Sequence, residues 1–305
     1  MRRTRFSGAL TLVTGAGSGI GRATALLVAQ RGGRLVLTDI QADGLAGTIA
    51  LLAGAGHADA VAHDEALDLT DADAVVAFAG RVHEAAGAVD VVMNVAGIST
   101  WGRIQDLDLA HWRRTVEVDL MGPIHVMHAF VPAMIEAGRG GHVVNVSSAA
   151  GLFGLPLHAP YSAAKFGLRG VSEVLRFDLA AHDIGVTLVC PGAVATPLVG
   201  TVDIVGVDRT DPRVVKAVSG FEKHAVSPEK AAEAMIRGVE KGRHTAFTSA
   251  DIRFGWYAQR YFPIGYSVFM HVMNRAARRI LLRVETEPRT DLTPAGTPPQ
   301  DVGAA

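Results

Sequence analysis

The sequence predicts a doubly wound α/β fold in three layers, a parallel sheet with helices on both faces. Short runs rich in Val, Leu and Ile alternate with Ala-rich stretches of helical spacing, and a glycine-rich turn follows the first run. Strands of a parallel sheet are buried on both faces, and each connection between two of them needs a crossover, usually a helix. We therefore expect one such domain over residues 1–250, followed by a C-terminal helical extension.

The first two thirds of the chain hold most of the expected elements. Strands are expected at 9–14, 34–39, 59–67, 89–94 and 142–146. Helices are expected at 20–31, 42–53, 71–86 and 109–137, and a further helix at 161–182 leads to a strand at 186–190. This alternation builds βαβ units and therefore one parallel sheet.

The regular pattern weakens after Pro191. Residues 196–226 contain two prolines and three glycines and are expected to form a loop that closes over the substrate. Ser227 as N-cap and Pro228 at the first helical position predict a helix to Lys241, followed by a strand at 244–248. Residues 251–285 are expected to form an aromatic and basic helical extension of the same domain, and residues 286–305 a disordered tail.

Composition narrows the functional classes. Lys and Arg total 29 and Asp and Glu total 30, so no basic excess favours a nucleic-acid partner. The single cysteine, Cys190, permits neither an internal disulfide nor a thiolate zinc site, and a reducing, cytoplasmic location is expected. No long apolar run precedes Gly15, so we expect no signal peptide. No stretch reaches the ~18 uncharged apolar residues that span a bilayer, so we expect no membrane span.

A glycine-rich turn follows the first strand. It places Gly15, Gly19 and Gly21 between that strand and the next helix. Glycine allows a sharp turn and a close approach of backbone to ligand, and the helix N-terminus offers N–H groups to a pyrophosphate. In the strand–turn–helix context this pattern predicts a Rossmann-type dinucleotide site.

Asp39 ends the second strand, twenty residues after Gly19. That is the place of a carboxylate that binds the adenine ribose hydroxyls and repels a 2′-phosphate, so NAD is expected, with NADP as the runner-up. Arg22 and Arg34 lie close to Asp39 in the sequence and could receive a 2′-phosphate, so NADP stays open as the alternative cofactor. A second alternative is that Asp39 only caps the turn before the next helix.

Tyr161 and Lys165 are four residues apart at a helix start and share one face. A phenol has a pKa of about 10, and a nearby ammonium favours the phenolate and lowers that value. Tyr161 is therefore expected to act as the acid or base near neutral pH. Ser148, at the end of a strand, is expected to hold the substrate oxygen beside it.

These motifs together resemble the short-chain dehydrogenase/reductase family, in its compact single-domain form. The matching elements occur in family order over about residues 8–250: Thr14-Gly15-x-x-x-Gly19-x-Gly21, Asp68, Asn94-Val-Ala-Gly97, Ser148, Tyr161-x-x-x-Lys165 and Pro191-Gly192-Ala-Val-Ala-Thr196.

The resemblance implies roles for further residues. Asp68 and Leu69 would contact the adenine, and Asn94 and Gly97 would line the cofactor groove. Lys165 would also bind the nicotinamide ribose. The rest of the implied cofactor site consists of Ser18, Ile20, Pro191, Val194 and Thr196.

Two positions depart from the family pattern. Val95 stands where the family often has a second Asn, a mild change because Asn94 is kept. Asp119 stands in the long helix where an Asn usually supports a proton-relay water. We include Asp119 in the catalytic set, and we expect a buried carboxylate there to raise the pKa of nearby groups.

The twelve histidines do not predict a metal site. His125 and His128 are three apart on an expected helix, but no third ligand is placed by the sequence, so no metal is expected. The family normally uses that helix as an oligomer interface, which makes a homodimer or homotetramer the expected state. His158, just before Tyr161, is either a pocket residue or an ordinary loop residue.

Residues 252–283 combine seven aromatic residues with several arginines. Three interpretations stay open. The segment packs over the substrate pocket or a partner subunit, lies on a membrane surface as a basic amphipathic helix, or completes the core of its own subunit. The first two suit a lipophilic substrate.

The expected function is interconversion of an alcohol and a ketone or aldehyde with NAD(H), on a steroid-, retinoid- or acyl-like substrate. Apolar residues of the 196–226 segment favour such a pocket: Leu198, Val199, Val202, Ile204 and Val205. An NADPH-dependent ketone reductase is the alternative enzyme. A dinucleotide-binding regulator without catalysis is the other alternative, although Tyr161 and Lys165 are both present.

Overall fold

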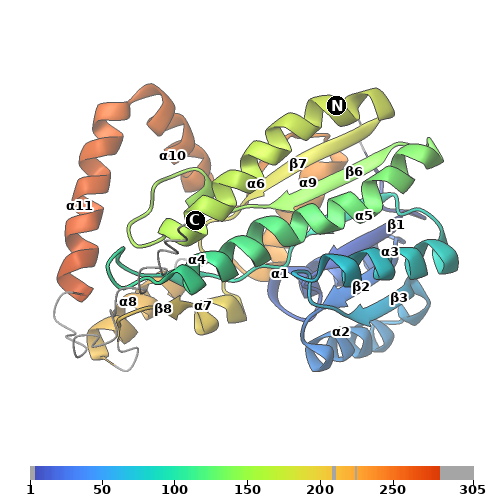
Figure 1. Cartoon of the computed structure of the whole chain (residues 1–305), viewed down its shortest axis with the longest axis horizontal. Helices are drawn as coiled ribbons and strands as arrows, with labels where there is room; N and C mark the ends of the chain where they lie inside the picture. The colour runs from blue at the N-terminus through green and yellow to red at the C-terminus, as the bar shows by residue number, and fades with distance from the viewer. Residues whose placement is uncertain (1–3, 208–210, 224, 282–305) are drawn as a thin grey trace, which may run out of the picture.

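Seven parallel strands form the central sheet of the computed structural model, which describes residues 4–207, 211–223 and 225–281 (Figure 1). Their order is β3-β2-β1-β4-β6-β7-β9. Their bounds are β1 Leu10–Thr14, β2 Arg34–Asp39, β3 Val61–Ala66, β4 Val91–Asn94, β6 Gly141–Val146, β7 Ile184–Cys190 and β9 Thr245–Phe247. The chain winds outward from β1 to β3 and then crosses to β4, so the predicted doubly wound fold is confirmed.

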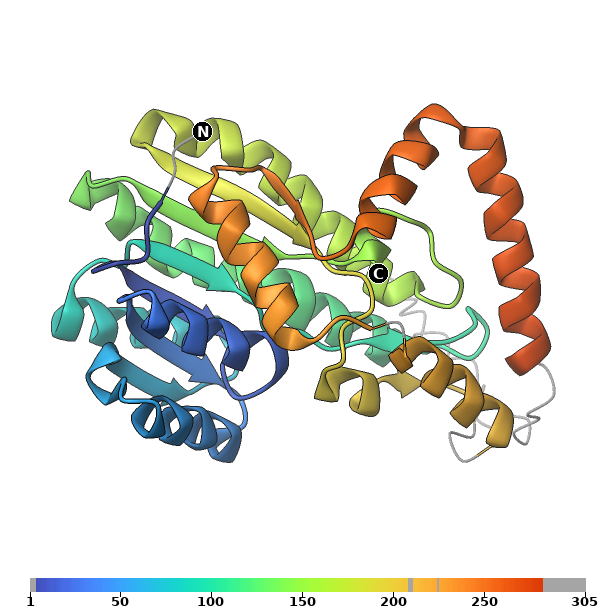
Figure 2. The same ribbon diagram turned by 180° about the vertical axis from the view of Figure 1, so that it is seen from behind.

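Helices cover both faces of the sheet (Figures 1 and 2). One face carries α1 (Gly19–Gln30), α2 (Ala42–Gly54) and α9 (Pro228–Glu240). The other carries α3 (Ala72–Ala86), α4 (Leu109–Val116), α5 (Gly122–Ala137) and α6 (Ala159–Asp178). Each face buries its own apolar cluster, for example Val28 and Met235 on the first face and Phe78 and Phe130 on the second. These two cores fix the strand ends that carry the site.

The single long helix expected at 109–137 is not uniform. A π-helical turn, Glu117–Met121, separates α4 from α5. The whole stretch Leu109–Ala137 is long and apolar enough to span a membrane by length and composition alone. However, 44% of its most apolar window is buried within the fold. The apolar pattern did not reveal the π turn, because an extra residue in one turn leaves the flanking periodicity nearly intact.

The expectation of a loop at 196–226 is wrong in part. The segment contains α7 (Pro197–Thr201), β8 (Asp203–Ile204) and α8 (Pro212–Lys223). Pro197 and Pro212 begin helices rather than preventing them, since the first helical position needs no N–H donor. β8 pairs in parallel with β5 (Thr100–Trp101), which forms a small second sheet that no pattern in the sequence predicts.

The C-terminal extension consists of α10 (Ala250–Tyr261) and α11 (Pro263–Leu281). Both views show α10 leaving the sheet edge and α11 standing apart from the body, with its far end toward α8 (Figures 1 and 2). We call α10 and α11 the arm. The disordered tail predicted for 286–305 lies outside the described residues.

Candidate active site

The expected site residues lie along the carboxyl edge of the sheet. β1 and β4 are neighbours there, and the chain winds away from them in opposite directions. Ligands of open α/β sheets bind in the crevice at such a point. The Thr14 hydroxyl links the two strand ends, since it accepts the N–H groups of Val95 and Ala96 at 3.0 and 3.2 Å.

The glycine turn leaves no room for side chains. Gly15 has φ +68°, and a Cβ on it would lie 2.8 Å from Ala96 Cα. A Cβ on Gly21 would lie 2.0 Å from the Gly15 carbonyl oxygen. The side chain of Ser18, at the N-cap of α1, makes no capping hydrogen bond. The first-turn N–H groups, which have no intrahelical partners in any α-helix, therefore also lack a cap from Ser18, and the turn fits a pyrophosphate.

Asp39 is held by backbone groups at the end of β2. Its carboxylate accepts the N–H of Gly17 and of Gln41, each at 2.8 Å. Asp39 therefore does cap the turn before α2, which is part of the second alternative. The same two hydrogen bonds fix its carboxylate beside the glycine turn. Arg22 hydrogen-bonds the Gly17 carbonyl, the Gly44 carbonyl and the Thr48 hydroxyl. Arg34 begins β2, at the opposite edge of the sheet.

Asp68 and Leu69, expected to contact the adenine, follow β3, and Asn94, expected to line the cofactor groove, ends β4. Asp68 is exposed and bonds the Thr70 backbone, while Leu69 is buried. Asn94 donates to Asn145 Oδ1 at 2.8 Å, and its own Oδ1 has no hydrogen-bond partner among the described residues although it is buried. An unpaired buried acceptor is unfavourable, so this oxygen is available to a hydroxyl donor such as a ribose.

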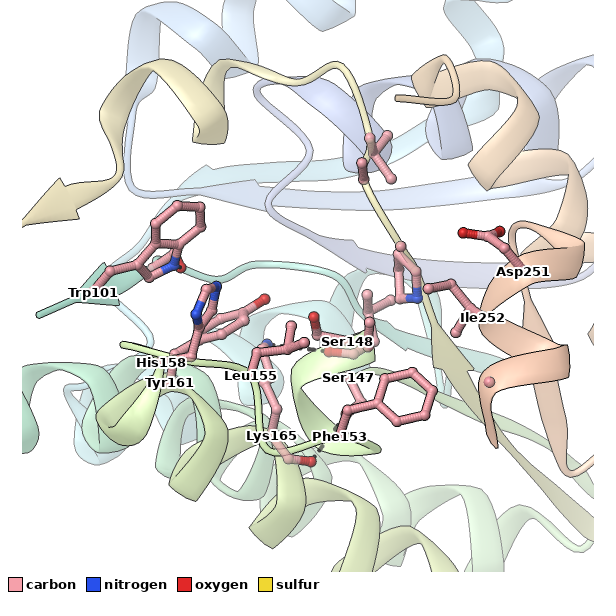
Figure 3. Close-up of a pocket in the computed structure, with 18 of the residues that line it drawn as sticks. Trp101, Ser147, Ser148, Phe153, Leu155, His158, Tyr161, Lys165, Asp251 and Ile252 are labelled. Carbon is pink, nitrogen blue, oxygen red and sulfur yellow. Dashed lines mark hydrogen bonds between the residues drawn. The ribbon is translucent and has the colours of Figure 1, made fainter. Parts of the chain in front are cut away.

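Ser148, Tyr161 and Lys165 converge on one point (Figure 3). Ser148 follows β6, whereas Tyr161 and Lys165 lie in the first turns of α6. Lys165 Nζ lies 5.5 Å from the centroid of the Tyr161 ring and donates to the Val146 carbonyl at 3.2 Å. The three side chains therefore approach one another in space as their spacing suggested. Their catalytic roles stay predictions.

Asp119 lies behind this set, in the π-helical turn. Its side chain is fully buried, and its Oδ1 lies 3.7 Å from Lys165 Nζ. Oδ1 also accepts the Ile98 N–H at 2.8 Å, whereas Oδ2 has no hydrogen-bond partner among the described residues. A Cβ on Gly97 would come within 2.8 Å of Oδ1, so only glycine lets the ion pair form there.

The electrostatics of Tyr161 differ from the expectation. Burial of the phenol, and after it repulsion by Asp119, hold the pKa of Tyr161 above its usual range, while hydrogen bonding from Ser148 opposes the rise. The expected net lowering of the pKa is wrong, because burial of the phenol raises it and Asp119, whose Oδ1 lies 3.7 Å from Lys165 Nζ, raises it further. The buried Asp119 carboxylate raises the pKa of its neighbour Tyr161, as expected.

Asp119 predicts a pH dependence of stability. Burial raises the pKa of Asp119 from 3.8 to about 6, with Lys165 opposing the rise. The folded state thus binds a proton more tightly than the unfolded state, and this contribution is lost as pH rises from about 4 to about 6. Over that range the wild type should lose of order 2 kcal/mol of unfolding free energy relative to Asp119→Asn, measured by urea unfolding. A difference that stays constant with pH would contradict the assignment.

An apolar cavity of about 840 Å³ opens in front of Tyr161. Its inner end is lined by Ser148, Tyr161 and Lys165 and also by Ile20, Gly97, Pro191, Val194 and Thr196 of the expected cofactor site. Its outer wall comes from the arm, including Phe254, Phe262, Tyr266 and Met270. Ile252, Trp256 and Tyr266 also pack against the core near Phe153. The arm therefore covers a pocket and completes the core, two of the three interpretations of the segment.

Sequence reasoning missed Trp101. Its ring lies 4.3 Å from that of His158, centroid to centroid, and both line the cavity beside Tyr161 (Figure 3). His158 Nδ1 donates to the Pro156 carbonyl at 2.6 Å, and burial lowers the pKa of His158, so its Nε2 is an acceptor. No periodicity marks Trp101. It reaches the pocket through β5, which exists only through its pairing with β8.

The described residues contain no cluster of three or more His, Cys, Asp or Glu side chains suited to a metal. His125, one of the two histidines considered, has its Nδ1 2.9 Å from the Leu69 carbonyl oxygen.

Comparison with known proteins agrees with this geometry. The sequence model of the short chain dehydrogenase family matches residues 9–204, from β1 to β8. The chain belongs to this family. Short-chain dehydrogenases are oxidoreductases that act on alcohols with NAD or NADP, so the chain is an enzyme of that class.

Relatives of this short-chain dehydrogenase cover most of its length. It is 36% identical to SadH of Mycobacterium tuberculosis, named as an oxidoreductase, over 240 residues, 78% of this chain and 85% of the relative. It is 39% identical to trans-4-hydroxycyclohexanecarboxylate dehydrogenase of Sinomonas cyclohexanicum over 64% of this chain and 75% of that one. A short-chain dehydrogenase/reductase from Burkholderia phymatum in complex with NAD superposes with a TM-score of 0.75 at 27% identity, over 84% of this chain and 94% of that chain.

Proposed function

We propose that this enzyme uses NAD(H) to interconvert a lipophilic secondary or primary alcohol and its ketone or aldehyde. The observation that carries the proposal is a shared cavity. Ser148, Tyr161 and Lys165 line the same space as Ile20 and Thr196 of the glycine-turn side. Catalytic groups and a cofactor groove that open into one cavity allow a substrate carbon to reach both.

The residues of the crevice fit the cofactor. The uncapped turn at Ser18 suits the pyrophosphate, and the unpaired Asn94 Oδ1 suits a ribose hydroxyl. Bound NAD supplies the hydride acceptor or donor. In this proposal the chain binds and orients it, with Asp39, Asp68 and Leu69 on the adenosine side and Val194, Thr196 and Lys165 on the nicotinamide side.

Tyr161 exchanges the proton with the substrate oxygen in this scheme. Ser148 donates a hydrogen bond to that oxygen, and Lys165 supplies positive charge behind it. The raised pKa of Tyr161 keeps the phenol protonated, the state in which it can give its proton to a carbonyl oxygen. Oxidation needs the phenolate, which the positive charge of an oxidised nicotinamide would stabilise.

Asp39 favours NAD over NADP in this proposal. Its carboxylate is fixed by two N–H donors where a 2′-phosphate would lie, and like charges repel. Arg22 is occupied by the Gly17 and Gly44 carbonyls and Thr48, and Arg34 lies at the other end of β2. Neither of the two candidate cations is free to receive a phosphate beside Asp39.

Asp39→Asn tests this preference. Asn keeps the shape and one acceptor oxygen but removes the charge, so we expect the ratio of Kd for NADPH to Kd for NADH to fall by about tenfold or more. The measurement is fluorescence titration with each cofactor. Asp43→Asn, a neighbouring charge in the first turn of α2, serves as the control and should leave the ratio unchanged. Tighter binding of NADPH than NADH by the wild type would overturn the preference.

The cavity supports a lipophilic substrate. Its lining is dominated by aliphatic and aromatic side chains, and its polar members besides the catalytic set are few, among them Ser99, His158 and Asp251. The cavity of about 840 Å³, which the substrate would share with the nicotinamide end of the cofactor, is of the usual size for ligand pockets and suits a steroid-, retinoid- or acyl-like molecule. The test is a turnover screen with NAD⁺ over matched short and long alcohols. A kcat/KM that does not increase with apolar size would contradict this substrate class.

A further inference from the structure

Exposed apolar side chains concentrate on the arm. Among the residues that the structure describes, eighteen large hydrophobic side chains are highly exposed, and nine of them lie between Phe254 and Met273. Four of these nine, Phe254, Phe262, Phe269 and Met273, also line the cavity, and the other five do not. Ile264 is 81% exposed and Phe262 71% exposed, at the corner where α10 meets α11. Scattered exposed apolar residues are ordinary, but a contiguous group of this size marks an interaction surface.

Helix α11 has two apolar faces. Tyr266, Met270 and Met273 point toward the cavity, which they line. Ile264, Val268 and Val272 recur every four residues, lie within about 80° of one another around the helix, and do not line the cavity. They are 58–81% exposed. We call these three residues the outer stripe. The cavity explains the inner face of α11, whereas no part of the fold formed by residues 4–207, 211–223 and 225–281 covers the outer stripe.

The arm is also the basic part of an otherwise acidic chain. Residues 250–281 contain five arginines and a single acidic residue, Asp251, whereas the whole chain has a net charge of −1. Arg253, Arg260 and Arg275 are exposed and form no ion pair with any described residue. Arg275 lies eleven residues after Ile264, within about 20° of it around α11, so it shares the side of the outer stripe. Exposed apolar side chains together with unpaired guanidinium groups on one arm are complementary to a surface that is negative outside and apolar beneath.

We propose that the outer stripe and the arm arginines bind the surface of an anionic membrane. Two arms of a symmetric dimer would bring like charges together, so the charge favours lipid over a second copy of the chain. Because α11 is the wall between the outer stripe and the cavity, a lipid-dissolved substrate would reach Tyr161 from the bilayer side. This last consequence rests on the proposed function, whereas the surface itself does not.

Vesicle sedimentation with the full chain tests the proposal. Binding to phosphatidylcholine vesicles that contain phosphatidylserine should be at least about tenfold tighter than to phosphatidylcholine alone, and salt should weaken it. Arg260→Glu/Arg275→Glu should reduce binding to the anionic vesicles by at least about tenfold. Lys230→Glu/Lys241→Glu, which reverses two exposed charges on and just after α9, is the matched control.

The apolar contribution is tested separately with Ile264→Ser/Val268→Ser, which should weaken vesicle binding by about tenfold or more. Leu51→Ser/Val76→Ser removes exposed apolar residues of α2 and α3 and should leave it unchanged. Turnover of a water-soluble alcohol without vesicles should be the same in all variants, which shows that they fold. If the wild-type chain binds vesicles but turns over no alcohol, the proposed function is contradicted and the membrane proposal is not.

Two outcomes overturn the membrane proposal. One is wild-type protein that does not sediment with anionic vesicles. The other is an outer-stripe variant that binds vesicles normally but loses an oligomer seen for the wild type by light scattering, which would assign the stripe to a second copy of the chain.

Discussion

Tyr161→Phe is expected to lower kcat/KM by about a thousandfold while leaving NADH binding within about twofold. The substitution removes only the hydroxyl that is hydrogen-bonded by Ser148 and that exchanges the proton in the proposed reaction. The ring stays in place beside Lys165, so no cavity opens and the cofactor groove keeps its shape. Steady-state kinetics with the best alcohol of the screen and an NADH titration measure the two effects.

Tyr266→Phe is the matched control. Its hydroxyl accepts the Gly154 N–H at 3.0 Å, and its ring lines the same cavity from the arm. Loss of that hydroxyl removes one hydrogen bond without touching Ser148 or Lys165, so kcat/KM should change by less than about fivefold. Wild-type turnover in Tyr161→Phe would refute the mechanism. An equal loss in both variants would show that the assay reports general damage to the pocket.

Lys165→Met is expected to abolish turnover and to lower the free energy of unfolding by about 3–5 kcal/mol. Lys165 has a side-chain exposure of 4% and Asp119 of 0%, and their charged atoms lie 3.7 Å apart. Removing the ammonium leaves a buried carboxylate without its counter-charge. The Val146 carbonyl also loses its donor from Lys165. Urea unfolding near neutral pH measures the loss.

The double variant Lys165→Met/Asp119→Asn separates the effect of the unpaired Asp119 charge on stability from the effect of the lost ammonium on turnover. Neutralising Asp119 removes the unpaired charge, so much of the stability lost in Lys165→Met should return, while turnover should stay abolished. Lys230→Met, at an exposed position of α9, should be near neutral for stability. If the double variant is no more stable than Lys165→Met, the ion pair is not what the lysine contributes to the fold.

Local patterns were sufficient for the sheet and for the members of the site. The expected strands coincide with all seven strands of the central sheet. Apolar runs located the buried strands, because a strand covered on both faces must be apolar on both. The signal was weaker at the edge strand β3, whose residues are partly or fully exposed. Ser148, Tyr161 and Lys165 were found from spacing within one stretch of chain and from their family resemblance. The three side chains lie close together because Ser148 follows a strand, while Tyr161 and Lys165 lie at the start of the next long helix.

Prolines and glycines were less informative. The same residues that suggested a loop at 196–226 begin α7 and α8, because a proline is compatible with the first turn of a helix. β5 and β8 were missed because each has only two residues and exists through its pairing with the other. The place of Trp101 in the cavity wall depends on that pairing.

The sequence by itself determined the family, the doubly wound fold and the residues that meet at the strand ends. Those properties follow from periodicity and from motifs whose members lie close along the chain. Only the tertiary structure decided the charge state around Tyr161 and the place of the arm. The pKa of Tyr161 depends on burial and on Asp119, which reaches Lys165 across a π-helical turn and the space left by Gly97. Such through-space electrostatics, and the choice of which face of α11 meets the cavity, depend on distances that no local pattern encodes.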